Sequence, residues 1–436
     1  MRILFLTHYF PPEGNAPATR VHAMAKHWVR AGHEVEVITC APNVPAGVVY
    51  PGYRNEIVRR ETIDGIHVTR VWTYLAPNAG FLRRISNYLS FALTGGLAAL
   101  RARRPDVLIA TSPQPFCGWA GQLVSALRQI PFVLEVRDIW PASILATKAM
   151  QPGLAIRLLE RAMNASYRAA GQIVTVGKGY ARELESLGVE PSHIAVVPNG
   201  IDSENFSPRP ADPEVRARLG IDGRFSCAYV GTIGMSCGLD LLIRAAERLK
   251  AEGDDSIRLL AVGDGAEREQ LESQARNKGL DNLIFTGRLP QNEIPALLAS
   301  VDCCLVHLRK APIFSSVLPS KIFEAAALER PIILGVEGDA AQLVNESGGG
   351  RCIEPENELE FLEAVQALKA APLDAQEMGQ RGRSFFAASY DRAALARTYI
   401  GILSPMTRLT AEEPSPTSGS ARGPNALPEG ISNAQS

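Results

Sequence analysis

The chain of 436 residues has no excess of charge of either sign and no long apolar run. Its 45 Lys and Arg residues are balanced by 46 Asp and Glu, so the formal net charge is -1 at pH 7. This balance gives no overall basic field for nucleic acid and no solvating acidity, and we expect no nucleic-acid partner. The sequence contains no run of about 18 uncharged apolar residues, so we expect no helix that spans a membrane.

Cysteine offers no structural framework, and the N-terminal stretch offers no export signal. The 7 cysteines are odd in number and scattered, and no pair has the spacing of a zinc ligand set. We therefore expect buried thiols in a reducing compartment and no bound metal. Residues 1–14 are interrupted too soon by proline to act as a secretion signal. These features lead us to expect a cytosolic protein.

The sequence does have short apolar runs that alternate with helical patterns almost from end to end. Strands separated by helices need crossover connections, which favours an α/β fold with parallel sheets covered on both faces. The expected strands lie at 2–7, 35–40, 106–110, 132–136, 172–176, 227–230, 257–262, 283–285, 303–306 and 331–334.

This pattern restarts near residue 200. Turn residues at 198–202 and a proline-rich stretch at 207–213 precede the second series of strands, so we predict two doubly wound domains. The tail is rich in Pro, Ser, Gly and Ala, a composition that cannot repay the entropy of ordering, and we expect it to be disordered. The predicted units are a first domain 1–198, a second domain 199–385, a helix 386–404 that packs back toward the first domain, and the tail 405–436.

Ligands of such sheets bind beyond the carboxyl ends of the strands, so the loops after the strands are the candidate sites. Gly14 and Asn15 follow the first strand, where glycine lets the backbone approach a ligand and a helix start offers free N–H groups. A simple strand-to-helix turn explains this loop equally well. Arg137 and Asp138 follow the strand 132–136. They either form a local salt bridge, with each other or with Glu135, or point into a cleft.

The second domain has two further candidate loops. Gly231, Thr232 and Gly234 precede a helix that we expect to start near residue 239, an arrangement suited to wrapping a phosphate with backbone N–H groups. The loop fits neither the dinucleotide nor the P-loop pattern. In the second loop, Lys321 and Glu324 stand three residues apart on a predicted helix. The lysine attracts phosphate and the carboxylate can accept from two sugar hydroxyls, while a surface ion pair is the plainer alternative.

Several motifs, taken together, resemble those of glycosyltransferase family 4, and the resemblance covers roughly residues 1–403. This family has two facing Rossmann-like domains, the architecture called GT-B. YFPPEG and EVRDIWP most resemble the branch that builds bacterial surface polysaccharides and includes fucosyl and N-acetylfucosaminyl transferases. The motifs that carry the family resemblance are PNGID at 198–202, VGDG at 262–265, FTGRLP at 285–290 and LPSKIFEAAALERPII at 318–333.

The resemblance implies retaining transfer of a sugar from a nucleotide donor, most often UDP-linked, with no metal or other cofactor. The sugar would be an N-acetylated amino sugar or a deoxy sugar. By the same resemblance, Glu324 holds the ribose hydroxyls, and Arg288 lies near the base. Gly14 and Asn15 close on the diphosphate and sugar from the first domain. The diphosphate is held by the backbone of two segments that include Gly231, Thr232, Gly234, Leu318 and Ser320.

Some positions depart from the family pattern. The first of two usual carboxylates falls at Ser316, and the usual Arg and Lys fall at Thr232 and Cys237. A loop that often has His-Asp has Arg137-Asp138 instead.

A leaving diphosphate needs positive charge, and we predict that Lys321, Arg288 and Arg137 supply it. No second carboxylate can be paired with Asp138. We therefore expect Asp138 or Arg137 to orient the donor sugar rather than to act as a covalent nucleophile. The predicted catalytic residues are Asp138, Arg137 and Lys321.

The segment 81–105 is apolar in its middle and has basic ends. A helix of this kind can lie in a membrane interface with its arginines on anionic headgroups, and a buried helix with charged ends is the alternative. Attachment at the inner face of the cytoplasmic membrane would suit a glycan or polyprenyl-diphosphate-linked acceptor, which the resemblance implies. The arginines predicted to contact membrane or acceptor are Arg83, Arg84, Arg101, Arg103 and Arg104.

Other functions remain open on the sequence alone. The donor could be of the GDP-fucose type. A sugar-nucleotide epimerase would turn over the donor without an acceptor, and a phosphorylase would depend on free phosphate. A non-catalytic partner would bind the nucleotide sugar without turnover, and the absence of a carboxylate at Ser316 keeps this reading open.

Overall fold

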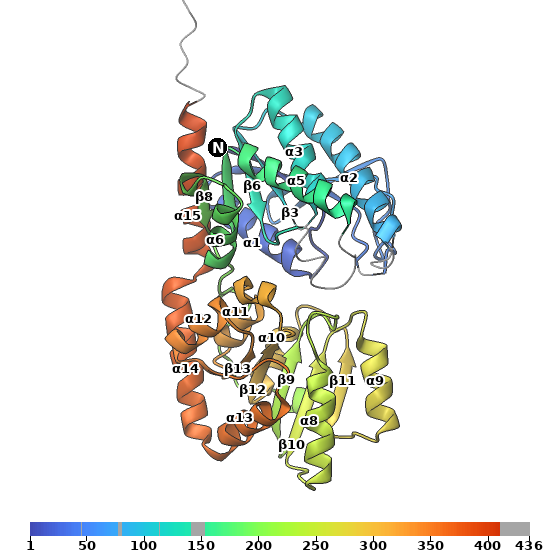
Figure 1. The fold of residues 1–436 in the computed structure, drawn as a ribbon, viewed down its shortest axis with the longest axis vertical. Coiled ribbons are helices and arrows are strands. Elements are labelled where there is room, and N and C mark those ends of the chain that lie inside the picture. The colour runs from blue at the N-terminus through green and yellow to red at the C-terminus, as the bar shows by residue number, and fades with distance from the viewer. Residues whose placement is uncertain (45, 77–80, 113, 141–152, 410–436) are drawn as a thin grey trace, which may run out of the picture.

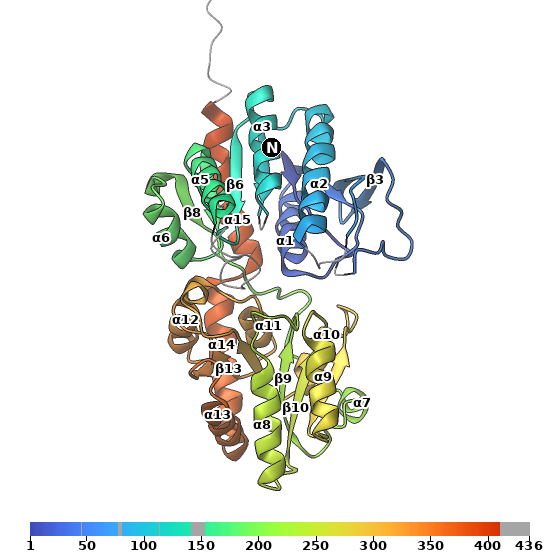
Figure 2. The same cartoon turned by 45° about the vertical axis from the view of Figure 1, so that its right-hand side comes forward.

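The computed structural model describes residues 1–436 except 45, 77–80, 113, 141–152 and 410–436. The chain forms two α/β units stacked along the long axis of the molecule, each with a central sheet between layers of helices (Figure 1). Turning the molecule by 45° shows the same two stacked units and one helix, α15 (Arg392–Leu409), running up beside the upper one (Figure 2). The prediction of two α/β units with parallel sheets is confirmed.

The N-terminal sheet has the strand order β3-β4-β2-β1-β5-β6-β7-β8. All its neighbouring strands are parallel except β3 and β4, an antiparallel hairpin that the sequence pattern did not predict. The strands are β1 Arg2–Leu6, β2 Glu34–Cys40, β3 Val58–Ile63, β4 Ile66–Val71, β5 Val107–Thr111, β6 Phe132–Val136, β7 Gln172–Thr175 and β8 Ile194–Val196. The helices are α1 Ala16–Arg30, α2 Phe81–Arg101, α3 Pro115–Arg128, α5 Leu154–Ala169, α6 Lys178–Ser186 and the 3₁₀ turn η1 Pro191–His193.

The C-terminal sheet has the order β11-β10-β9-β12-β13-β14, and its strands are all parallel. They are β9 Phe225–Val230, β10 Ile257–Val262, β11 Leu283–Gly287, β12 Cys303–His307, β13 Ile332–Gly335 and β14 Gly350–Cys352. The helices are α7 Pro213–Arg218, α8 Asp240–Ala251, α9 Arg268–Asn277, α10 Ile294–Ser300, η2 Pro312–Ser316, α11 Lys321–Ala327, α12 Asp339–Ser347, α13 Glu358–Ala370 and α14 Pro372–Ser389.

Each sheet buries apolar side chains on both faces, as expected for crossover connections. Along β1, Leu4 belongs to the cluster under α2, α3 and α5, whereas Phe5 belongs to the cluster under α1 and α15. Along β9, Cys227 and Ala228 divide between the two faces of the second sheet in the same way. The seven cysteines are unpaired, and all but Cys352 are buried. Within the described ranges, no helix has the length and apolarity needed to cross a membrane.

The predicted C-terminal helix 386–404 is two helices, because α14 ends at Ser389 and α15 runs over Arg392–Leu409. Between them the backbone pairs with the first interdomain segment, where the Ile201 N–H donates to the Tyr390 carbonyl at 2.8 Å. The two chain crossings between the units therefore lie side by side.

Helix α15 then packs against α1 of the N-terminal unit. The Trp28 indole N–H donates to the Ala396 carbonyl at 3.0 Å, and the Tyr399 ring packs edge-on to Trp28. The predicted return to the first unit is thus confirmed. The tail expected from residue 405 starts later, because α15 continues through Pro405 and Met406 packs on the N-terminal core. Residues 410–436 lie outside the described ranges.

Candidate active site

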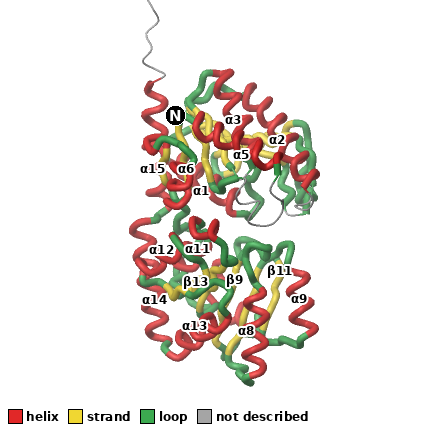
Figure 3. Tube along the Cα trace, viewed as in Figure 1, coloured by secondary structure: helices red, strands yellow, loops and turns green. Residues whose placement is uncertain are grey.

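The loops that follow the strands of the two sheets face each other across the middle of the molecule (Figure 3). In the C-terminal unit the central one is the 231–238 loop, between β9 and α8. Its backbone packs directly on the next loop, where a Cβ on Gly263 would overlap the carbonyl oxygen of Gly231. A Cβ on Gly265 would likewise overlap the carbonyl of Ile233. The glycines of the VGDG motif therefore allow two loops to approach each other closely.

Lys321 and Glu324 lie beside this loop. The Lys321 Nζ is 3.2 Å from Glu324 Oε2, and the Lys321 stem passes 3.2 Å from the position that a Cβ on Gly231 would take. The predicted pair thus forms, and it lies where the carboxyl ends of β9 and β12 meet. Glu324 is half-buried, and the lysine, which is partly exposed, can exchange this partner for an anionic ligand.

Cys237 shapes the loop. Its side chain is buried, and its Sγ donates to the Thr232 carbonyl at 3.1 Å. The Tyr229 hydroxyl donates to the same carbonyl at 2.7 Å. The two positions at which the family usually has Arg and Lys are therefore Thr232, which is exposed, and Cys237, whose buried thiol fixes the loop. No positive charge enters the site from either of them.

Ser316 lies at a contact between the two units. It ends η2, and a Cβ on Gly179 of α6 would lie 2.6 Å from the Ser316 Cβ. The next residue, Val317, packs on the apolar cluster of the N-terminal unit. Gly179 is therefore the residue that lets α6 approach Ser316 this closely. The absence of the carboxylate thus coincides with a tight contact between the two units.

Arg288 and Gly14 lie at a second contact between the units. The Arg288 Nη1 is 3.5 Å from the Val44 carbonyl, and its guanidinium lies over the Tyr50 ring at 5.6 Å. A Cβ on Gly14 would be 3.5 Å from the Gln291 side chain. The structure thus brings these two predicted donor residues to the same side of the cleft.

Three further residues predicted to bind the sugar donor, Asn15, Leu318 and Ser320, lie in loops next to helices. Asn15 caps α1, because its Oδ1 accepts from the Ala18 N–H at 2.9 Å, so this side chain already has a structural role. Leu318 and Ser320 are half-buried in the turn that leads into α11.

Glu135 belongs to the predicted strand 132–136, which the structure confirms. It lies within β6, its side chain is 1% exposed, and its Oε2 is 3.2 Å from the Arg20 Nε. The local pairing of Glu135 with Arg137 is therefore not formed. Arg20 also donates to the Val197 carbonyl at 2.7 Å, which ties α1 to the segment that leaves the N-terminal unit. Arg20 lies four positions before Met24, on the apolar face of α1. A charged residue on that face was the sequence signal for this pair.

Arg137 follows β6 and is held through its backbone, whose N–H donates to Ser112 Oγ at 2.7 Å. Its Nε and Nη1 are buried and have no hydrogen-bond partner among the residues that the structure describes. Burial lowers the Arg137 pKa to about 10, and the Glu135 carboxylate opposes this shift. The side chain therefore stays cationic at neutral pH. Asp138 is half-buried beside it.

Other buried polar atoms along the same sheet edge also lack partners within the described part of the chain. They belong to loops or strand ends at β1, β5 and β7, so they lie in a row at the carboxyl edge of the parallel strands. Since buried polar atoms are normally paired, this row marks an edge with unused hydrogen-bonding capacity. The atoms are His8 Nδ1, Gln114 Nε2 and Thr175 Oγ1.

The five arginines of the segment 81–105 do not form one patch. Arg83 and Arg101 are separated by most of α2, which corresponds to roughly 30 Å along a helix. Arg103 lies 3.7 Å from Glu34, and Arg104 donates to the Gln129 carbonyl at 3.1 Å. Arg84 lies over the Tyr88 ring. The basic residues therefore occupy both ends of a helix rather than one surface.

In the described part of the chain, no three His, Cys, Asp or Glu side chains are grouped as metal ligands would be. The expectation that no metal is needed stays a prediction.

Two family models match the chain, one for each unit. The glycosyl transferase 4-like domain matches residues 15–200, and the glycosyl transferases group 1 domain matches residues 212–385. The chain is a glycosyltransferase with the GT-B fold.

Named relatives agree with this assignment. The putative colanic acid biosynthesis glycosyl transferase WcaI of Escherichia coli K12 is 27% identical over 82% of this chain and 89% of its own. A GDP-mannose-dependent alpha-mannosyltransferase of Mycobacterium tuberculosis is 26% identical over 79% and 81%. The crystal structure of Anabaena HepE in complex with UDP and glucose superposes with a TM-score of 0.69 and 17% identity. This superposition covers 93% of this chain and 99% of that one.

Proposed function

We propose that this glycosyltransferase moves a sugar from a UDP-linked donor, with retention of configuration, to a lipid-linked or oligosaccharide acceptor in cell-surface polysaccharide biosynthesis. The observation that carries the proposal is the Lys321–Glu324 pair beside the backbone of Gly231, at the edge that faces the N-terminal unit. The UDP bound in HepE and the polysaccharide role in the name of WcaI support the donor and the pathway class.

The site's chemistry suits a departing diphosphate. As the bond from the anomeric carbon to the phosphate oxygen breaks, negative charge grows on the diphosphate, and Lys321 and the backbone N–H groups of the 231–238 loop stabilise it. Glu324 accepts from the ribose hydroxyls. The acceptor oxygen bonds to the same face of the sugar, and its proton passes to the leaving phosphate oxygen. Arg137, with Asp138 beside it, orients the sugar from the other side of the cleft.

The acceptor side includes a surface for an anionic membrane. Helices α2 and α3 lie in contact, with Gly96 facing Ala120, and both have exposed leucines on their outer sides. Leucine side chains flanked by arginines suit an interface of acyl chains and anionic headgroups, where a polyprenyl-diphosphate acceptor resides. These leucines are Leu93, Leu97, Leu100, Leu123 and Leu127.

Cosedimentation with vesicles of phosphatidylglycerol and phosphatidylcholine at low salt tests this contact. The wild type should sediment with anionic vesicles and not with neutral ones, and the double variant Leu97→Ser/Leu123→Ser should stay in the supernatant. Leu359→Ser, an exposed leucine of the C-terminal unit, is the matched control and should sediment like the wild type. A wild type that stays in solution with anionic vesicles would rule out the attachment.

Calorimetric titration with UDP, GDP and ADP, first without metal and then with magnesium, tests the donor. The proposal predicts binding of UDP that magnesium does not change, and loss of that binding in Glu324→Gln. A preference for GDP would favour a GDP-sugar donor such as GDP-fucose, an alternative supported by the GDP-mannose-dependent relative. No binding by any nucleotide would contradict the proposal.

Turnover assays separate the remaining alternatives. Consumption of the UDP-sugar without acceptor would indicate an epimerase, and dependence on free phosphate a phosphorylase. Binding with no turnover at all would indicate a non-catalytic partner.

A further inference from the structure

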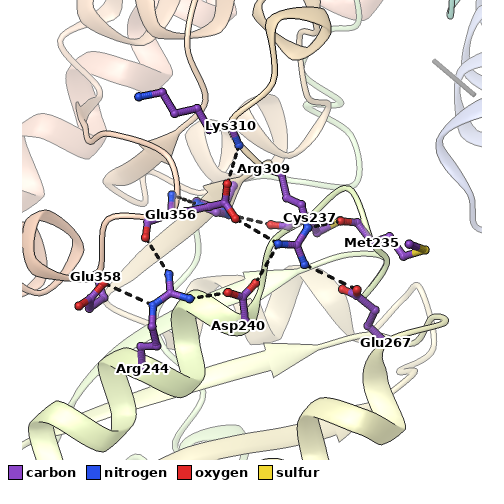
Figure 4. Close-up of polar contacts among 10 residues, drawn as sticks. Met235, Cys237, Asp240, Arg244, Glu267, Arg309, Lys310, Glu356 and Glu358 are labelled. Carbon is purple, nitrogen blue, oxygen red and sulfur yellow. Dashed lines mark hydrogen bonds and ion pairs between the residues drawn. The ribbon is translucent and has the colours of Figure 1, made fainter. Parts of the chain in front are cut away.

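Three consecutive peptide carbonyls of the 231–238 loop are held by residues at the end of β12. The Arg309 Nε donates to the Met235 carbonyl at 2.6 Å, and the Arg309 backbone N–H donates to the Ser236 carbonyl at 2.9 Å. The His307 Nδ1 donates to the Cys237 carbonyl at 2.7 Å. Figure 4 shows Arg309 between the loop and a ring of carboxylates. One neighbouring segment therefore holds the three loop carbonyls that precede Gly238.

This arrangement orients the N–H groups of the loop. In one peptide unit the carbonyl and the N–H point in opposite directions, so fixing the carbonyls on β12 turns the N–H groups away from it. The Cys237 N–H donates to the Gly234 carbonyl at 2.8 Å. The N–H groups of Ser236 and Gly238 have no hydrogen-bond partner within the ranges that the structure covers. Unpaired N–H groups of this kind, at the start of a helix, can bind an anion.

His307 is suited to a fixed, uncharged role. Its side chain is buried, and its Nε2 accepts from the Glu356 N–H at 2.9 Å while its Nδ1 donates to the Cys237 carbonyl. Both ring nitrogens are thus used by the neutral tautomer. Burial lowers its pKa, which favours the same neutral form. A Cβ on Gly238 would lie 3.1 Å from the ring, so the loop backbone rests directly on the imidazole.

Arg309 is held too tightly to reach a ligand itself. Its guanidinium lies 3.1 Å from Glu356, 3.3 Å from Asp240 and 3.7 Å from Glu267 (Figure 4). These carboxylates neutralise its charge and fix its position. The side chain thus presents its Nε to Met235 and acts on the site only through the loop.

We propose that His307 and Arg309 are positioning residues for the donor diphosphate. They fix the 231–238 loop so that its free N–H groups bind the phosphates, at a site where Thr232 and Cys237 supply no cation. This inference rests on the proposed function, because it assumes that the loop binds a nucleoside diphosphate.

The test compares affinities for UDP and for uridine, which has no phosphate. Arg309→Met should weaken UDP binding about 10-fold, the size expected for losing one hydrogen bond that holds the loop, and leave uridine binding unchanged. Arg244→Met is the matched control. Arg244 is 37% exposed against 38% for Arg309 and contacts Asp240, but it donates to the Glu356 carbonyl and not to the loop. It should leave both affinities unchanged.

A pair of variants at His307 gives an independent readout if Arg309→Met does not fold. His307→Asn keeps a donor for the Cys237 carbonyl and should bind UDP within about threefold of the wild type, whereas His307→Leu should lose about 10-fold.

Equal losses for UDP and uridine, or equal effects of Arg309→Met and Arg244→Met, would overturn this inference while leaving the proposed function intact. A wild type that binds no nucleotide would overturn both.

Discussion

The two edges that face each other across the cleft differ in how their polar groups are used. On the C-terminal side, the carbonyls of the 231–238 loop are bonded to Tyr229, His307 and Arg309. On the N-terminal side, buried nitrogens of Arg137 have no partner among the described residues. A loop whose carbonyls are already bonded holds its free N–H groups in fixed positions before the ligand arrives, whereas the Arg137 side chain waits for the ligand to complete its bonds. The difference suggests a fixed site for the nucleotide and an adaptable one for sugar and acceptor.

The largest expected effect concerns Arg20, the well-paired group next to the N-terminal edge. Arg20→Met leaves Glu135 buried without its cationic partner and removes the donor to the Val197 and Pro198 carbonyls. The free energy of unfolding should therefore fall by about 3–5 kcal/mol. Denaturant unfolding measures this. The double variant Arg20→Met/Glu135→Gln should recover part of the loss, because it leaves no charge unpaired. A loss below about 1 kcal/mol in the single variant would contradict the role of this pair.

His8, in the N-terminal unit, predicts a pH dependence of stability. Burial among the rings of Tyr9, Tyr88 and Phe91 lowers its pKa from 6.5 to about 4. The folded state disfavours the proton, so stability is highest above pH 6.5 and falls as pH drops from 6.5 toward 4. The total is roughly 3 kcal/mol.

Unfolding measured between pH 7 and 5 in the wild type and in His8→Phe isolates this contribution. In the variant, the free energy of unfolding should change less with pH over this range, because the contribution of His8 is gone. Identical slopes in the two proteins would mean that His8 is not buried in its neutral form.

Lys321 should affect the reaction rate more than binding, because it acts on charge that develops in the transition state. Lys321→Ala should lower kcat about 100-fold and change the KM for the donor only a few-fold. Steady-state transfer assays give both values. An unchanged kcat would refute its role as the cation for the leaving group.

Substitution of Arg137 should have the smallest effect. It distinguishes a role in orienting the transferred sugar from a role in binding the nucleotide. Arg137→Met should lower the transfer rate about 10-fold and leave UDP affinity unchanged, since UDP lacks the transferred sugar that this side chain orients. Arg182→Met, an exposed arginine of α6, is the control and should alter neither. If UDP affinity fell in Arg137→Met, the side chain would belong to the nucleotide site.

The sequence was sufficient for the fold because apolar runs separated by helical patterns can be satisfied only by covered parallel sheets. It did not reveal the β3–β4 hairpin, because β3 is half-exposed and charged and the buried strand β4 is interrupted by polar residues. It also placed the end of the last helix too early. Pro405 favours a stop, but packing of Met406 on the N-terminal core outweighs that preference.

The site was predictable where chemistry is local and hidden where it depends on long-range contacts. Lys321 and Glu324 are three residues apart, so one helix suffices to pair them. The ion pair of Glu135 was not predicted, because its partner, Arg20, lies 115 positions away. The role of His307, which directly follows the predicted strand 303–306, was not predicted because its two hydrogen bonds go to loops far from it in sequence.

The most direct test of the asymmetry is hydrogen–deuterium exchange of the protein with and without UDP. The account predicts protection in the 231–238 loop and in residues 318–324, with little change at residues 112–138. Protection mainly at residues 112–138 would contradict it, because the nucleotide would then bind to the N-terminal edge.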